Sequence, residues 1–457
     1  MQSNYFKIGI LVLACLFQLP IHAQDHQQTV DELFKLSLSE GKSYQDLEYL
    51  CKSVGHRLSG SPGAAAAVEY TRALMKSYGF DSVWLQPVMV PNWKRGSKEI
   101  LRINQSVAGP LELNSLALGN SVGTGPQGVT ADIIEAKDLS HLEQLGKEVE
   151  GKIVFINGKA DPTQYETFRA YGGAVMQRAY GASEAAKYGA RAVIIRSITQ
   201  SQDDTPHTGS LRYKPNMPQI AAVAISTNDA DLLSDLLSKG TVSAYMQTLC
   251  ETQPDVLSYN VIGQINGSSS NSIIAAGGHL DSWDVGEGAH DDGSGCIQAI
   301  EALRLIKTTG YKPKNNLRAV MWMNEENGLA GGREYAHMAE ENRETHLAAI
   351  ESDRGGFLPI GFTSTGEESK QIVMQSFKSY FKPWGLHDFE RPGGGADIGP
   401  LAQQNTFLIG LLPVGQRYFR YHHTPADVFE AVDRRELELG AAAIASMIYL
   451  IDQTGLQ

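Results

Sequence analysis

The sequence predicts an α/β fold, in which helices cover both faces of a mostly parallel, mixed sheet and a second β/α unit is inserted. Three observations support this. From about residue 255 onward, strand-like and helix-like segments alternate, which is typical of a parallel sheet covered on both sides. Between about residues 98 and 248, short β-rich runs are separated by Gly, Asn and Pro turns. The 457 residues also exceed one ordinary core, so we expect two or three domains.

The changes in texture divide the chain into four parts. Residues 1–23 form a targeting segment, and residues 24–97 form the N-terminal part of the main domain. Residues 98–250 form the inserted domain. Residues 251–457 complete the main domain and carry the candidate site.

The N-terminus has the features of a signal peptide. Lys7 supplies a positive charge, residues 8–19 are mostly apolar, and Ala23 prepares a small-residue cleavage site. The apolar run is too short for a membrane span. Lipidation at Cys15 is the alternative, but the mature chain would then begin with apolar residues rather than a polar tether. We therefore expect a periplasmic or secreted protein with no membrane span.

Periodicity predicts the elements of the first half of the chain. Amphipathic spacing indicates three helices before the insertion, and Ser61-Pro62 and Gly79 mark the start and end of the third. Within the insertion, β-rich runs bounded by turn residues predict strands. The expected elements are helices at 29–41, 44–55 and 63–78, extended chain at 80–90, strands at 99–103, 131–134 and 152–156, a helix at 182–188 and a strand at 192–195.

In the second half, each of four strands is followed by a helix. In open sheets of this kind, ligands bind beyond the carboxyl ends of the strands. The expected strands are 272–277, 316–323, 347–351 and 406–412, and the expected helices are 293–307, 328–338, 369–381 and 436–451.

Composition excludes several classes of function. A net charge of −12, with no offsetting basic stripe, argues against a nucleic-acid partner. After the signal peptide, Cys51, Cys250 and Cys296 remain. They are odd in number and lack CxxC spacing, so they indicate neither a thiolate zinc site nor a disulfide framework.

Metal-binding residue types follow the predicted strands of the second half. Each group lies near the carboxyl end of a strand or in the loop after it, so we expect all of them at one edge of the sheet. The candidates are His279, Asp291, Glu325, Glu326, Asp353, His422 and His423.

Five of these side chains suit two zinc ions. Zinc takes nitrogen and oxygen ligands, and a pair of ions needs a carboxylate with two oxygens to bridge them. We assign that bridge to Asp291. Each ion then keeps one imidazole, from His279 or His423, and one terminal carboxylate, from Asp353 or Glu326. The absence of Cys ligands favours a catalytic site over a structural one.

The remaining acid, Glu325, is the candidate general base. Successive side chains of a strand point to opposite faces, so Glu325 and Glu326 can converge only if the strand has ended. Neighbouring carboxylates would raise the pKa of Glu325 and cations would lower it, and the sequence does not give the net sign. Asp281 is the candidate partner for the imidazole N–H of His279, which would fix its tautomer.

The candidate residues lie in five short motifs. These are His279-Leu280-Asp281-Ser282, Asp291-Asp292-Gly293-Ser294-Gly295, Asn324-Glu325-Glu326, Asp353-Arg354-Gly355-Gly356 and His423-Thr424-Pro425-Ala426-Asp427. In this order they resemble the motifs of the co-catalytic zinc aminopeptidase and glutamate carboxypeptidase family. The resemblance covers nearly all of the mature chain. It implies that the five residues above are zinc ligands, that Glu325 is the base, and that a dipeptide or short peptide is the substrate.

Two further features are interpreted through resemblance. Residues 151–154 and 185–194 resemble a protease-associated domain, which usually carries no catalytic residue. Many family members have a Tyr immediately before the last zinc histidine, where it stabilises the oxyanion. Here that position is His422, and Tyr421 is one residue further back. His422 is therefore our first choice for the oxyanion partner.

Several alternatives stay open at this point. An aminopeptidase acting on longer chains, a single-zinc glutaminyl cyclase and a non-catalytic binding protein are rival functions, and the complete ligand set argues against the last. Cobalt or manganese could occupy the same ligands. Arg354, Arg391 and Arg420 are candidates for holding a terminal carboxylate. The glycine-rich residues 392–397 form either a wall that approaches substrate or a flexible turn. A homodimer is one option for the oligomeric state.

Overall fold

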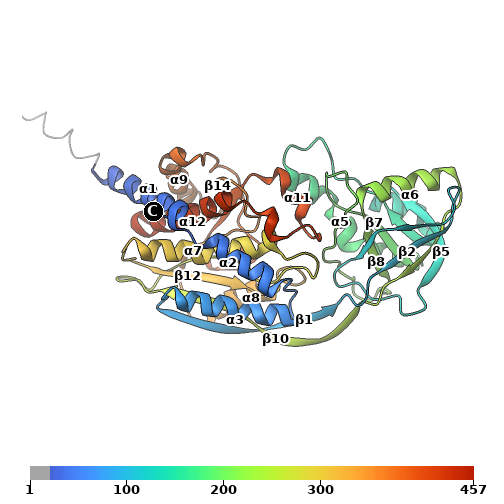
Figure 1. Ribbon diagram of the computed structural model, residues 1–457, viewed down its shortest axis with the longest axis horizontal. Helices are drawn as coiled ribbons and strands as arrows, with labels where there is room; N and C mark the ends of the chain where they lie inside the picture. The colour runs from blue at the N-terminus through green and yellow to red at the C-terminus, as the bar shows by residue number, and fades with distance from the viewer. Residues whose placement is uncertain (1–20, 457) are drawn as a thin grey trace, which may run out of the picture.

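A computed structural model describes residues 21–456, which contain two separate sheets. The seven-stranded sheet and its helices (residues 21–94 and 251–456, the main unit) form one end of an elongated molecule (Figure 1). The eight-stranded sheet and its helices (residues 100–247, the second unit) form the other end. Most of the predicted signal peptide, residues 1–23, lies outside the described residues.

The sheet of the main unit is parallel in its centre and antiparallel at both edges. Its strand order is β1-β10-β12-β11-β13-β15-β14. Strands β12, β11, β13 and β15 run parallel, whereas β1, β10 and β14 join through antiparallel pairs. The strands are β1 (Ser82–Lys94), β10 (Glu251–Ile265), β11 (Ile273–His279), β12 (Asn316–Trp322), β13 (His346–Glu351), β14 (Pro359–Thr365) and β15 (Phe407–Pro413).

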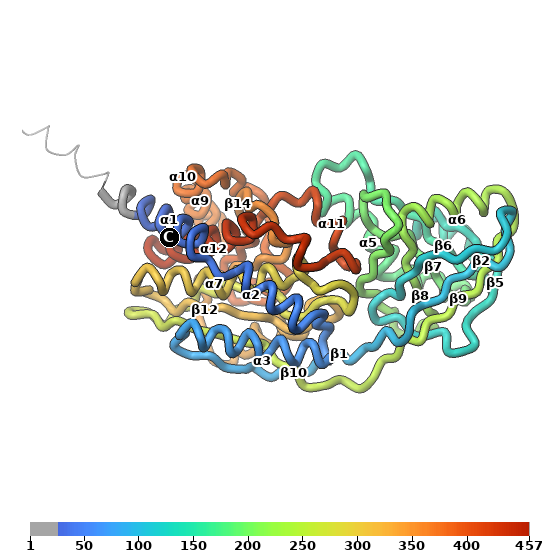
Figure 2. Tube along the Cα trace, in the orientation of Figure 1, coloured from blue at the N-terminus to red at the C-terminus, as the bar shows by residue number. Residues whose placement is uncertain are grey.

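The four parallel strands agree with the sequence prediction, whereas β10, which lies between β1 and β12, and the edge strand β14 were missed. β10 begins with exposed residues and is buried only in its second half, so it lacks a clear apolar alternation. β14 contains Pro359 and Gly361, which are unfavourable within a central strand and are tolerated at an edge. The paired strands β1 and β10 lie side by side along one edge of the molecule and extend toward the second unit (Figure 2).

Helices cover both faces of this sheet, as expected. Side chains of β12 alternate between two apolar clusters: Leu317 and Met321 pack in the cluster with α7 and α12, and Val320 and Trp322 pack in the cluster with α8. This alternation is the two-residue period of a strand buried on both faces. The helices are α1 (Ile21–Glu40), α2 (Ser43–Tyr49), α3 (Pro62–Ser77), α7 (Ser294–Thr308), α8 (Ala330–Glu341), α9 (Glu368–Ser376), α10 (Lys378–Phe381), α11 (Tyr418–Tyr421) and α12 (Arg434–Thr454).

The helix boundaries follow local signals with two exceptions. The Ser61 side chain caps α3 by accepting a hydrogen bond from the amide of Ala64, with Pro62 in the first turn. The helix predicted at 44–55 is instead α2 followed by a π-helical turn, Leu50–Val54. The helix predicted at 369–381 is divided into α9 and α10.

The second unit has a mixed sheet of its own, in the order β3-β2-β9-β5-β6-β7-β8-β4. The helix predicted at 182–188 is the end of a longer helix that begins at Thr167. Its first part was missed because the glycines at 172 and 173 weaken the helical signal there. The strands are β2 (Ile100–Gln105), β3 (Leu111–Leu113), β4 (Ser115–Ala117), β5 (Val129–Ala136), β6 (Ile153–Ile156), β7 (Ala192–Arg196), β8 (Ala221–Ile225) and β9 (Ser243–Gln247), and the helices are α4 (Leu139–Leu145), α5 (Thr167–Ala186) and α6 (Thr227–Lys239).

The two units are in direct contact near α11. The hydroxyl of Thr167, in the first turn of α5, donates to the carbonyl of Gly415 at 2.8 Å. The hydroxyl of Thr199 donates to the carbonyl of Phe419 at 2.6 Å. Figure 1 shows α5 and α11 facing each other between the two ends of the molecule. The second unit therefore touches the loop that carries the last two histidines of the candidate site.

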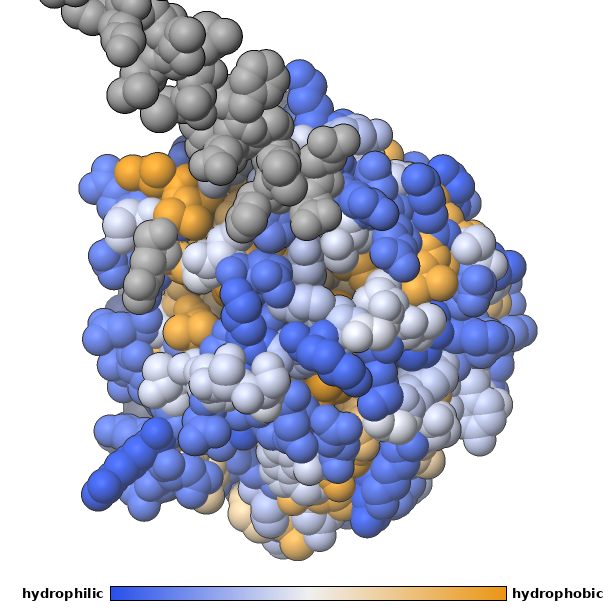
Figure 3. All heavy atoms as spheres, turned by 90° about the vertical axis from the view of Figure 1, so that its left-hand side faces the viewer, coloured by the Kyte–Doolittle hydropathy of each residue, from blue (hydrophilic) through white to orange (hydrophobic). Residues whose placement is uncertain are grey.

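Three further features of the described residues concern membrane crossing, the thiols and the polarity of the surface. Across residues 21–456, no helix combines the length and apolar character that a bilayer crossing requires. Cys51, Cys250 and Cys296 are buried free thiols. On the face of the main unit seen in Figure 3, polar side chains predominate and apolar ones form small separate groups.

Candidate metal centre

The candidate residues gather where four neighbouring parallel strands end. Strand β11 ends at His279, β12 at Trp322, β13 at Glu351 and β15 at Pro413, and these strands are adjacent in the sheet. The loops that follow carry the other candidates. The structure thus brings His279, Asp291, Glu326, Asp353 and His423 into one cluster, at the edge where the sequence analysis expected them.

Asp291 lies between two imidazoles. Its Oδ1 is 3.1 Å from Nε2 of His279, and its Oδ2 is 3.4 Å from Nε2 of His423. Asp353 Oδ1 lies 3.5 Å from the His279 nitrogen, and Glu326 Oε2 lies 3.1 Å from the His423 nitrogen. The cluster therefore consists of two imidazole–carboxylate pairs that share Asp291.

The oxygens of this cluster fit cations. Asp291 Oδ2, Glu326 Oε1 and Asp353 Oδ1 are buried and have no hydrogen-bond donor among the described residues. Buried carboxylates without donors are costly unless a positive charge compensates them. Burial, with Asp291 nearby, raises the pKa of Glu326 well above its usual value. Divalent cations would provide the missing partners: the ligand atoms of His279, Asp292 and Asp353, of His279, Asp291 and Glu326, and of Asp291, His422 and His423 lie within 4.8 Å of one another in each group.

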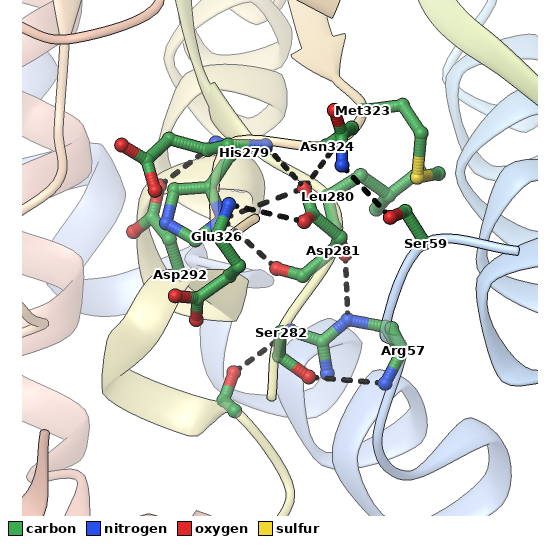
Figure 4. Close-up of polar contacts among 12 residues, drawn as sticks. Arg57, Ser59, His279, Leu280, Asp281, Ser282, Asp292, Met323, Asn324 and Glu326 are labelled. Atoms are coloured by element: carbon green, nitrogen blue, oxygen red, sulfur yellow. Dashed lines mark hydrogen bonds and ion pairs between the residues drawn. The ribbon is translucent and has the colours of Figure 1, made fainter. Parts of the chain in front are cut away.

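Asp281 contacts the imidazole of His279, as predicted, but through its main-chain carbonyl. The Nδ1 atom of His279 is 2.9 Å from the main-chain carbonyl of Asp281 and 3.8 Å from its carboxylate. The predicted contact to the imidazole is therefore made by the carbonyl. The carboxylate instead accepts the amides of Asn324, Glu325 and Glu326, at 2.6, 3.0 and 3.2 Å (Figure 4). Asp281 thus orients His279 and also holds the turn that carries both glutamates.

Glu325 lies in that turn, where β12 has already ended. Asn324 has a positive φ of 76°, which redirects the chain so that consecutive glutamates need not face opposite sides of the sheet. Burial, opposed by His279 and reinforced by Asp353, raises the pKa of Glu325 to about 8. Bound cations would act in the opposite direction and favour the carboxylate.

Arg57 and Ser59, which the sequence analysis did not select, brace two loops of the site. The buried Arg57 guanidinium donates to the carbonyls of Leu280, Glu287 and Gly288 at 2.7–2.9 Å. The hydroxyl of Ser59 accepts a hydrogen bond from the side-chain amide of Asn324 at 2.9 Å. Figure 4 shows both residues approaching the cluster from the N-terminal part of the chain.

Asp427 and Asp292 accept backbone amides around Asp291 and His279. The Asp427 carboxylate accepts the amides of His290 and Asp291, at 2.7 and 3.1 Å. Asp292 accepts the amides of His279 and Gly295, at 3.1 and 3.0 Å. Through Gly295, Asp292 also bonds to the first turn of α7. Asp427 was noticed only as the end of a motif, because no local pattern indicates its partners 136 residues away.

His422 stacks on His423, with ring centroids 3.4 Å apart, and its Nε2 lies 3.8 Å from Asp291 Oδ2. Burial lowers the pKa of His422 to about 3, so the ring is neutral at physiological pH. Tyr421 is turned away and packs against His290. Of the two oxyanion candidates, only His422 faces the cluster.

The second unit contributes directly to the site through Thr208. The Nδ1 atom of His423 is 3.3 Å from the carbonyl of Thr208, whose amide donates to the carbonyl of His423 at 3.0 Å. A hydrogen bond from Nδ1 leaves Nε2 free to face the carboxylates. The Arg178 guanidinium also lies 3.5 Å from Nδ1. The backbone there leaves no room for a side chain, because a Cβ atom on Gly209 would collide with the Arg178 guanidinium and would lie 2.6 Å from Nδ1 of His423.

Comparisons with known proteins identify the family. Residues 260–448 match the family model described as peptidase family M28. Carboxypeptidase Q of Bos taurus is 33% identical over 432 residues, which is 94% of this chain and 89% of that protein.

Solved structures are similar as well. A peptidase M28 precursor from Shewanella amazonensis SB2B has a TM-score of 0.89 and 32% identity, covering 94% of this chain and 97% of that one. A zinc aminopeptidase from Bacillus subtilis has a TM-score of 0.64 at 21% identity, covering 89% and 94% of the two chains, and shares the fold.

Replacing Gly209 with Ala should weaken cation binding on the His423 side alone, because the added methyl group collides with the Arg178 guanidinium and with the imidazole and so displaces His423 from Thr208. We expect affinity for the second of two cobalt ions to fall about 10- to 100-fold, as for other changes behind a metal-binding histidine. Titration with Co²⁺, followed by visible absorption, measures this. Gly172→Ala, in a helix position where an added methyl group meets no neighbour within 4 Å, is the control. Unchanged binding of both ions would show that the Thr208 contact does not orient His423.

Proposed function

Because the chain belongs to peptidase family M28 and is similar to carboxypeptidase Q, we propose that it is an exported metallopeptidase that cleaves dipeptides or short peptides with two zinc ions. One ion would be held by His279 and Asp353, the other by His423 and Glu326, with Asp291 shared between them. The observation that carries this proposal is the position of Asp291, whose two oxygens face imidazoles on opposite sides.

The chemistry would be metal-assisted hydrolysis of an amide. Two bound zinc ions supply Lewis acidity and lower the pKa of a water molecule toward neutrality. Glu325 then takes the proton from the attacking water and later delivers it to the leaving amine. His422, which is neutral and faces Asp291, would donate its N–H to the oxygen that gains negative charge.

The remaining parts of the proposal concern the rest of the chain. Residues 1–23 would direct export to the periplasm or beyond the cell. The second unit would be a protease-associated-like domain that supplies no catalytic side chain but orients His423 through Thr208. Short substrates are supported by the closeness of this unit to the site, and an aminopeptidase acting on longer peptides is the alternative.

Metal content tests the two-ion arrangement. We expect two zinc ions per chain by elemental analysis, and about one in each of the variants His279→Ala and His423→Ala, because each loses one imidazole. Removing zinc with a chelator should also lower Tm, since the buried carboxylates then repel one another. A single ion in the unaltered protein would favour a glutaminyl cyclase and contradict the shared role of Asp291.

The role of Glu325 can be tested separately from metal binding. Glu325→Gln should keep both zinc ions and lower kcat for an unblocked dipeptide by about 10²- to 10⁴-fold, because the amide cannot accept the proton. Glu340→Gln, an exposed change in α8, is the control and should retain full turnover. Loss of zinc in Glu325→Gln would make Glu325 a ligand, and undiminished turnover would remove it from the mechanism.

A further inference from the structure

An open pocket of about 340 Å³ adjoins the candidate metal centre on the side of Asp353. Its walls come from three parts of the chain: Asp353 and Arg354 after β13, the glycine-rich loop at Gly394 and Gly395, and Phe168 in the first turn of α5. This volume is at the lower end of the range for small-ligand pockets. It suits a single amino-acid residue better than an extended chain.

The glycine-rich loop is a fixed wall of this pocket. The carboxylate of Glu351, the last residue of β13, accepts the amides of Ala396 and Ile398 at 2.8 and 2.9 Å. A Cβ atom on Gly395 would collide with that carboxylate, so only glycine allows the loop to lie so close. Of the two alternatives considered from sequence, a wall that approaches substrate or a flexible turn, these contacts favour the wall.

Arg354 is a cation without an anionic partner in this pocket. Among residues 21–456, its guanidinium has no hydrogen bond and no ion pair within 4 Å, and it lies over the Phe168 ring at 4.9 Å. The Phe168 ring is itself held by stacking on Tyr418, at 4.9 Å between centroids. The guanidinium is thus fixed in direction while its donors remain available to a ligand.

The other two arginine candidates are already excluded by their surroundings. Arg391 pairs with Glu166 at 2.6 Å and with Asp388, so both ends of its guanidinium are engaged. Arg420 is exposed and does not line the pocket. Of the three arginines considered for binding a terminal carboxylate, only Arg354 lines the pocket with its donors available.

We propose that Arg354 binds the free C-terminal carboxylate of the substrate and so restricts this peptidase to substrates that end one residue beyond the cleaved bond. This inference rests on the proposed function. Adjacent residues of an extended peptide are about 3.3–3.6 Å apart along the chain. A carbonyl at the metal centre therefore puts the carboxylate of the next residue close to the metals. Arg354 directly follows Asp353, a proposed ligand, and lines the same pocket.

The chemistry of the pair is specific. Arginine and a carboxylate form two parallel charge-assisted hydrogen bonds, and an amide in the same place cannot satisfy both donors. The leaving residue would then lie between Phe168 and the glycine-rich loop. A peptide that continued beyond this residue would have to pass the wall formed by the loop.

The test compares a free dipeptide with its C-terminal amide in the zinc-loaded enzyme. The unaltered enzyme should prefer the free acid. Arg354→Met should raise KM for the free acid by about 10- to 100-fold, the usual effect of losing a hydrogen bond to a charged group. Its kcat should change little, because this contact is made equally in the ground and transition states. Activity on the amide should stay the same, and Arg354→Lys should recover part of the preference for the acid.

Arg420→Met removes the same charge from an exposed position and should leave both substrates unaffected. Zinc content and Tm, measured for each variant, show that the site is intact, and the acid-to-amide ratio of the unaltered enzyme is informative without any variant. An enzyme that cleaves neither substrate would refute the proposed function. An enzyme that cleaves both equally well, or an Arg354→Met variant with an unchanged KM for the acid, would overturn only the role of Arg354.

Discussion

The structure around the site depends on one carboxylate shared between two imidazoles. Asp291 faces His279 with one oxygen and His423 with the other, although these histidines are 144 residues apart and follow different strands. Asp292, Glu326 and Asp353 are close by, and carboxylates brought together out of water repel one another strongly. Such a cluster is stable only with compensating positive charge, so the fold and the proposed cations explain each other.

Backbone amides stabilise the carboxylates that would not touch a cation. Asp281 accepts three amides of the turn after β12, Asp427 accepts two around Asp291, and Glu351 accepts two of the glycine-rich loop. Each of these acids therefore fixes the backbone of a neighbouring loop rather than binding a ligand. Unpaired buried oxygens, by contrast, occur on Asp291, Glu326 and Asp353, which are candidate metal ligands. Arg57 completes this support by binding three carbonyls of the loop between β11 and α7.

The sequence could predict the parallel strands and the residues at their ends, because apolar runs and their polar C-terminal neighbours are local signals. It could not predict contacts that depend on the backbone. The sequence named Asp281 as the partner of the His279 imidazole, but the contact is made by its main-chain carbonyl, a group that every residue possesses, so residue type could not identify the atom. Asp427 and Thr208 were missed for the same reason, since their partners are main-chain groups or lie 215 residues away. Strand β10 was missed because its first half is largely exposed, and the edge strand β14 was missed because an edge tolerates proline and glycine.

The second unit is better understood as part of the site than as a cover over it. A cover could move away and leave the centre intact, but here the carbonyl of Thr208 selects the nitrogen that His423 presents to the carboxylates. The same unit supplies Phe168, against which Arg354 lies, and the first turn of α5 is tied to the loop before α11. Separating the units would therefore release one imidazole and one wall of the pocket together. Because both contacts come from the same unit, the proposed orientation of His423 for metal binding and the proposed selection of substrate length by Arg354 would be physically coupled.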